Sequence, residues 1–135
     1  MKDFKKGWIA VDLDGTLAHY DEFRGADHIG EPIAPMINRV KQWLAEGRDV
    51  RIFTARVDGG IEADKQGEPG AEQFRNPNTI RTIIQDWCEL HIGQRVPVTN
   101  VKDYGMIELW DDRAVRVVKN TGEMCCGRPT QTWTP

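Results

Sequence analysis

The sequence predicts a single α/β domain of the doubly wound, Rossmann-like type: a three-layer sandwich with a central, mostly parallel sheet of five strands. Three observations predict this class. Short apolar runs alternate with segments of helical periodicity, as in βαβ units. The 135 residues suffice for one domain with one core. The first apolar run is almost uninterrupted, as expected of a central strand covered on both faces.

Five short segments carry the strand pattern. The expected strands are residues 7–13, 49–54, 95–99, 106–110 and 115–118. Pro97 lies inside the third segment. Because proline cannot donate a hydrogen bond to a ladder, we expect this strand at an edge of the sheet.

Two longer segments carry the helix pattern. In the first, residues 36–44, apolar residues recur at helical spacing, with Pro35 near the start and Gly47 just past the end. The second is expected at residues 76–92, with Asn76 as the cap and a proline at the first helical position. Its apolar face consists of Ile80, Ile83, Ile84, Trp87 and Leu90.

The remaining segments are connections. Residues 57–75 are rich in glycine and charge and exceed the ordinary connection of about 2 to 6 residues, so we predict a mobile loop beside the site. Residues 1–126 are expected to form the domain and residues 127–135 a C-terminal tail.

Charge and composition exclude several classes of protein. The chain has 18 Lys and Arg against 21 Asp and Glu, and a net charge of -3 disfavours polynucleotide partners without excluding them. The apolar run at residues 8–11 is too short for a signal peptide or a membrane helix, so we expect a cytoplasmic protein with no membrane partner. The three cysteines are expected to be free thiols.

The sharpest motif is Asp12-Leu13-Asp14-Gly15-Thr16, at the end of the first expected strand. In an extended chain Asp12 and Asp14 point to the same face, about 6 to 7 Å apart, so both can address one substrate or metal ion. Gly15 then permits a turn. The structural alternative is a simple Asx turn after a strand.

Further polar residues follow the other expected strands: Thr54 the second, Lys102 the third, and Asp111 with Asp112 the fourth. Each signal is weak alone, since such residues are often solvated or cap a helix. In open parallel sheets, however, ligands bind beyond the carboxyl ends of the strands, where all of these residues are expected.

In the order and type of these residues the sequence resembles the haloacid dehalogenase-like phosphohydrolases, over roughly residues 8–118. The resemblance implies a Mg²⁺-dependent phosphatase that cleaves phosphate monoesters through an aspartyl phosphate. It makes Asp12 the nucleophile, Asp14 the general acid and base, and Thr54 and Lys102 the ligands of the phosphate. The gaps where the family inserts cap domains are short here, so we expect no cap.

The resemblance also implies the remaining contacts of the site. Mg²⁺ would be held by Asp12, the backbone carbonyl of Asp14, and the pair Asp111 and Asp112, of which we favour Asp112 as the direct ligand. The expected substrate-binding residues are Gly15, Thr16, Thr54, Arg56 and Lys102. Arg56 could instead face solvent.

Elementary electrostatics supports the cation independently of the family. Four carboxylates around one pocket repel by about 4 kcal/mol per close pair at 4 Å and an effective dielectric constant of 20. A hard divalent ion with oxygen ligands relieves that repulsion. The sequence therefore predicts Mg²⁺ as the cofactor.

Two other functions are compatible with the same residues. A receiver-like signalling module uses an acidic pair, a phosphorylated Asp, a Thr and a Lys, but its adjacent acidic pair comes first, whereas here it comes last. A non-catalytic binding protein on the same scaffold is the other alternative. The expected partner is a phosphorylated small molecule or macromolecule, and a homo-oligomer is left open.

Overall fold

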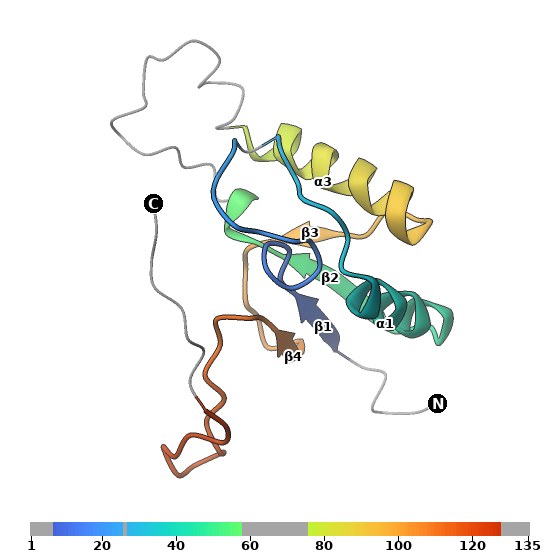
Figure 1. The fold of residues 1–135 in the computed structure, drawn as a ribbon. Coiled ribbons are helices and arrows are strands. Elements are labelled where there is room, and N and C mark those ends of the chain that lie inside the picture. The colour runs from blue at the N-terminus through green and yellow to red at the C-terminus, as the bar shows by residue number, and fades with distance from the viewer. Residues whose placement is uncertain (1–6, 26, 58–75, 128–135) are drawn as a thin grey trace.

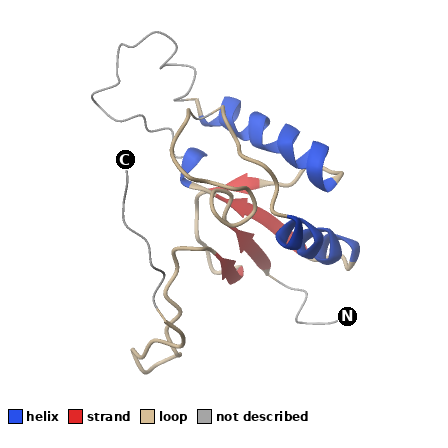
Figure 2. Cartoon of the chain, viewed as in Figure 1, coloured by secondary structure: helices blue, strands red, loops and turns tan. Residues whose placement is uncertain are grey.

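The structure, a computed structural model, describes residues 7–25, 27–57 and 76–127. In this part of the chain four strands form one parallel sheet, in the order β3-β2-β1-β4, and two α-helices pack on it (Figures 1 and 2). The strands are β1 (Trp8–Val11), β2 (Asp49–Phe53), β3 (Val98–Thr99) and β4 (Met106–Trp110). The helices are α1 (Ala34–Ala45), the short 3₁₀ helix η2 (Ala55–Val57) and α3 (Pro77–Ile92). The predicted α/β class is confirmed.

Strand β1 lies inside the sheet, between β2 and β4. All four of its residues are buried, as its apolar sequence predicts. Strand β3 lies at one edge of the sheet, as Pro97 predicts. The Pro97 carbonyl accepts a hydrogen bond from the Ile52 backbone N–H at 2.8 Å. The Pro97 nitrogen, by contrast, has no proton to donate to a further strand. The edge position of this strand is confirmed.

Both predicted helices are confirmed, and local signals explain their ends. Pro35 lies in the first turn of α1, where its missing N–H costs nothing. At the start of α3 the Asn76 side chain accepts a hydrogen bond from the backbone N–H of Asn78 at 2.9 Å. Gly93 ends this helix in the left-handed conformation, with φ of 102°.

The two α-helices contact each other and share one core with the sheet. That core takes alternate strand residues, Ile9 and Val11 from β1 and Val50 and Ile52 from β2, which therefore point to the same face. The expected three-layer sandwich is not found in the described residues. The two crossovers that contain α-helices, β1 to β2 and β2 to β3, run in the same direction along the sheet, so right-handed connections put both helices on one face.

The expected fifth strand at residues 115–118 is wrong. In the described structure this segment forms an isolated bridge, Val117 to Met124, and a local pair of backbone hydrogen bonds instead of joining the sheet. Val115 and Val117 remain 38% and 53% exposed. The valine-rich pattern predicted a strand, but the chain turns at Gly122 and pairs with itself, leaving β4 as the second edge of the sheet.

Two sequence-based predictions lie outside the described residues. The predicted mobile loop, residues 57–75, lies outside them except for Val57, and the predicted tail, residues 127–135, lies outside them except for Gly127. Among the helices that the structure describes, none combines the length and apolar character needed to cross a bilayer.

Candidate active site

The register of the sheet brings two parts of the acidic motifs side by side. Val11 of β1 pairs with Trp110 of β4, although 99 positions separate them in the sequence. The residue that follows each strand is an aspartate, and the Asp12 backbone N–H donates to the Trp110 carbonyl at 2.9 Å. Parallel pairing thus places Asp12 beside Asp111 at the carboxyl end of the sheet.

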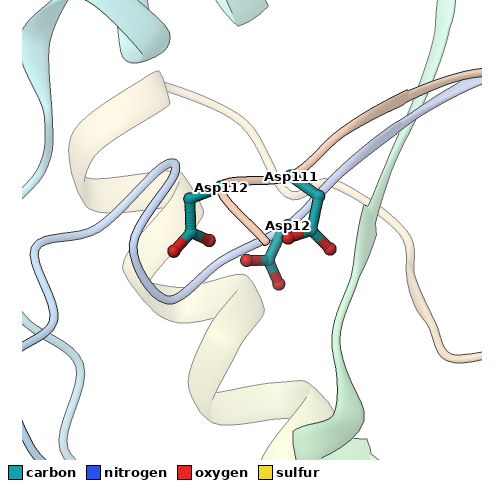
Figure 3. Close-up of side chains that lie close together, drawn as sticks. All are labelled: Asp12, Asp111 and Asp112. Carbon is teal, nitrogen blue, oxygen red and sulfur yellow. The ribbon is translucent and has the colours of Figure 1, made fainter. Parts of the chain in front are cut away.

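Three carboxylates converge at this point, those of Asp12, Asp111 and Asp112 (Figure 3). Each offers one oxygen, and these oxygens all lie within 4.8 Å of one another. All three side chains are partly buried. The prediction that the first aspartate motif and the later aspartate pair lie close together is therefore confirmed for the positions of Asp12, Asp111 and Asp112.

Asp12 has a strongly perturbed acidity. Burial, then the charge of Asp111 and a hydrogen bond with Asp112, raise the pKa of the Asp12 carboxyl to about 8. The Asp12 carboxyl therefore stays largely protonated near neutral pH unless a cation joins the cluster. Oxygen donors in this number suit a hard divalent cation such as Mg²⁺, so the residues present fit the expected cofactor.

Asp112 is held by the turn that follows β1. Its backbone N–H donates to Thr16 Oγ1 at 3.0 Å, and the same hydroxyl donates to Asp112 Oδ1 at 3.2 Å. Gly15 has a φ of +88°, and a Cβ there would lie 2.6 to 2.9 Å from the Asp112 carboxyl atoms. Only glycine fits both this conformation and this close approach.

The Asp14 carboxylate lies outside the three-carboxylate cluster and binds Arg56 instead. Arg56 Nε donates to Asp14 Oδ2 and Nη2 to Oδ1, each at 2.8 Å. The two side chains are only 9% and 22% exposed. The alternative that Arg56 faces solvent is wrong.

The extended path expected through this motif is also wrong. Strand β1 ends at Val11, and Leu13 opens a turn in which its carbonyl accepts from the N–H groups of Leu17 and Ala18. Asp12 and Asp14 both line the same cavity. Because a turn separates them, however, their side chains have different partners.

Thr54 follows β2 and is 4% exposed. Its backbone N–H donates to the Thr99 carbonyl at 3.0 Å, which anchors it to the edge strand. Its hydroxyl oxygen accepts from the Arg56 backbone N–H at 3.2 Å, so the hydroxyl proton is directed elsewhere. Thr54 therefore also positions the helix η2 that carries Arg56.

These residues surround one cavity of about 570 Å³. It is lined by Asp12, Asp14, Gly15, Tyr20, Asp21, Phe23, Phe53, Thr54, Ala55, Arg56, Asp111, Asp112 and Arg113. The sequence reasoning missed six of these residues: Tyr20, Asp21, Phe23, Phe53, Ala55 and Arg113. A signal was available for two of these: Tyr20 and Phe23 are aromatic residues in the otherwise polar stretch 18–31, directly after the first motif.

Lys102 is exposed and is not among the described residues that line the cavity. The next residue, Asp103, accepts hydrogen bonds from Trp8 Nε1 and from the Gly105 backbone N–H, both at 2.8 Å. Asp103 thereby holds the turn before β4. The role of Lys102 as a phosphate ligand stays a prediction.

The sequence matches no protein-family model and no curated protein. Among solved structures the chain is similar to a conserved protein from Bacteroides thetaiotaomicron, with a TM-score of 0.52 at 20% identity, over 82% of this chain and 78% of that one. At this identity the likeness concerns the fold alone.

Proposed function

We propose that the chain is a Mg²⁺-dependent phosphohydrolase of the haloacid dehalogenase-like type, cleaving phosphate monoesters through an aspartyl phosphate on Asp12. The observation that carries this proposal is the convergence of Asp12, Asp111 and Asp112 on a cavity that Asp14 and Thr54 also line. Phosphate ester hydrolysis needs a far larger acceleration than a single acid or base supplies, so several groups must act together.

In the first step an oxygen of Asp12 attacks the phosphorus and the bond from phosphorus to the leaving oxygen breaks. Asp14, oriented by Arg56, donates a proton to that leaving oxygen. In the second step Asp14 takes a proton from a water molecule whose oxygen attacks the same phosphorus. The bond to Asp12 then breaks, phosphate leaves and the Asp12 carboxylate is restored.

The remaining roles follow the family resemblance. Asp12, Asp111 and Asp112 would hold Mg²⁺, with Asp112 favoured as a direct ligand and the backbone carbonyl of Asp14 completing the set. When bound, the cation would neutralise negative charge on the phosphoryl group while it is being transferred. Thr54 and Lys102 are assigned to phosphate oxygens. The resemblance also assigns Gly15, Thr16 and Arg56 to the substrate, but Thr16 is not among the described residues that line the cavity, and Arg56 binds Asp14.

The raised pKa of Asp12, about 8, supports the need for a cation. A nucleophile must be ionised, and burial together with neighbouring carboxylates disfavours that state here. Asp12 would be held in the ionised form, the form that attacks phosphorus, if the three carboxylates bound a divalent ion.

The test is phosphate release from 4-nitrophenyl phosphate with Mg²⁺, for the wild type, Asp12→Asn and the control Asp86→Asn. Asp86 is an exposed carboxylate on α3, paired with Arg95 at 2.7 Å. We expect Asp12→Asn to lose at least about 10³-fold in kcat and the control to keep full activity. The proposal is wrong if Asp12→Asn retains most of the activity or if exhaustive chelation leaves turnover unchanged. Stable phosphorylation without phosphate release would favour the receiver-like alternative.

A further inference from the structure

The cavity is much larger than a phosphate group requires. Its volume is about 570 Å³. It also lies within the range of about 300 to 1,000 Å³ that is usual for small-molecule sites. Most of the cavity is therefore available to the rest of the substrate, and its walls indicate what that part is.

Three aromatic residues are among those that line the cavity. Tyr20 and Phe23 come from the connection after β1, and Phe53 is the last residue of β2. Phe23 is 47% exposed although it is a large apolar side chain. Arg56, through Nη1, also donates to the Gly25 carbonyl at 3.5 Å, which ties this connection to the residues that hold Asp14. Aromatic side chains that line a cavity bind flat rings by stacking or edge contacts.

The charged groups of the cavity disfavour a second anion. Asp21 is paired with Arg24 at 2.9 Å, outside the cluster. The lining then holds four carboxylates against two guanidinium groups; these are Asp12, Asp14, Asp111 and Asp112 with Arg56 and Arg113. A divalent cation would only balance this charge. Among the described residues that line the cavity, no positive charge is left over for an anionic group on the leaving side, and like charges repel such a group.

We propose that the substrate is a phosphate monoester whose leaving group carries an uncharged aromatic ring, bound against Tyr20 and Phe23. This inference rests on the proposed phosphohydrolase function and names its substrate class. Phosphorylated sugars, which carry no aromatic ring, and substrates with a second acidic group are the disfavoured classes.

The first test compares substrates with similar alkyl leaving groups, so that chemical reactivity does not decide the outcome. Benzyl phosphate carries a neutral ring, cyclohexylmethyl phosphate a non-aromatic one, 4-carboxybenzyl phosphate a charged ring, and glycerol 1-phosphate none. We expect kcat/KM for benzyl phosphate to exceed each of the others by about fivefold or more, in line with the free energy of an aromatic contact. Equal values for benzyl phosphate and glycerol 1-phosphate would overturn the inference while leaving the proposed hydrolysis intact.

The second test uses variants. Phe23→Ala should lower kcat/KM for benzyl phosphate about tenfold and leave glycerol 1-phosphate within twofold, since a stacked ring contributes roughly this much by alanine substitution. The matched control is Tyr104→Ala, because Tyr104 is an exposed aromatic residue that does not line the described cavity. An equal loss for both substrates would show a structural role for Phe23 and count against the inference.

A binding measurement separates this inference from the proposed function. Calorimetric titration with benzylphosphonate and methylphosphonate, in the presence of Mg²⁺, reports recognition without turnover. Tighter binding of benzylphosphonate, reduced by Phe23→Ala, supports the aromatic subsite even if no phosphate monoester is hydrolysed. Equal affinity for the two phosphonates would overturn it.

Discussion

The guanidinium group of Arg56 holds both carboxylate oxygens of Asp14, with Nε 2.8 Å from Oδ2 and Nη2 2.8 Å from Oδ1. The pair joins the turn after β1 to the helix η2 after β2, across 42 positions of sequence. A bidentate pair of this geometry fixes the plane of the carboxylate as well as its position. In the proposed reaction Arg56 is therefore the residue that orients the general acid.

Replacing Arg56 by lysine should slow turnover about 10- to 100-fold, because an ammonium group cannot hold both oxygens and general acid catalysis depends on orientation. The loss should be larger for benzyl phosphate than for 4-nitrophenyl phosphate, whose leaving group needs little protonation. Steady-state kinetics on the two substrates measures this. Arg51→Lys is the matched control. Arg51 makes a similar two-point pair with Asp49, and neither residue of that pair lines the described cavity. The same loss for both substrates would contradict the orienting role.

Replacing Gly15 by alanine should weaken Mg²⁺ binding about tenfold or more, because the new Cβ would displace the Asp112 carboxylate. The control is Gly47→Ala. Gly47 has a similar φ of +79°, but a Cβ there meets no atom of the described residues within 4 Å. Both variants should lose about 1 to 2 kcal/mol of stability from the left-handed backbone. Calorimetric titration should separate them by Mg²⁺ affinity, and equal affinities would contradict the steric account.

Chelated wild-type protein should lose stability as the pH rises from about 4 to about 8. The folded state holds the Asp12 proton up to a pKa of about 8, whereas the unfolded chain releases it near 3.8, so the folded state binds more protons in this window. The expected decrease in the free energy of unfolding is on the order of a few kcal/mol. It should level off above pH 8.

Urea unfolding in a chelator at several pH values measures this dependence. Asp12→Asn should remove the decrease and exceed the wild type in stability at pH 8, while Asp86→Asn should follow the wild type. Added Mg²⁺ should restore wild-type stability near pH 8. A wild-type stability that rises across this window would contradict the raised pKa of Asp12.

Replacing Thr16 by valine should remove the hydroxyl that bridges the backbone and side chain of Asp112. We expect a loss of about 1 to 2 kcal/mol in the free energy of unfolding and a several-fold weaker affinity for Mg²⁺. Thr82→Val is a suitable comparison, because the Thr82 hydroxyl donates to the Asn78 carbonyl within its own exposed helix turn, at 3.0 Å, far from Asp112 in the sequence. An unchanged Mg²⁺ affinity in Thr16→Val would show that Asp112 is positioned without this bridge.

Local patterns were sufficient to predict the helices. The periodic apolar residues and the prolines and glycines at the ends of α1 and α3 act within a few residues of one another, so they can be read from sequence alone. The same local patterns failed at residues 115–118. There valines predict a strand, but membership in a sheet depends on a partner, and this segment pairs with itself.

By itself, then, the sequence determined the α/β class, the buried central strand and the placement of Asp12, Thr54 and Asp111 at strand ends. These properties follow from the order of elements along the chain. A parallel sheet brings strand ends together whatever lies between them.

Only the tertiary structure decided the partners within the site. It assigns Arg56 to Asp14, Thr16 to Asp112 and three aromatic residues to the cavity lining, and it raises the pKa of Asp12. Each of these depends on contacts between residues tens of positions apart, and on burial that exists only after β1 and β4 pair in register. No local pattern encodes that register, so the chemistry of the carboxylates is a property of the fold.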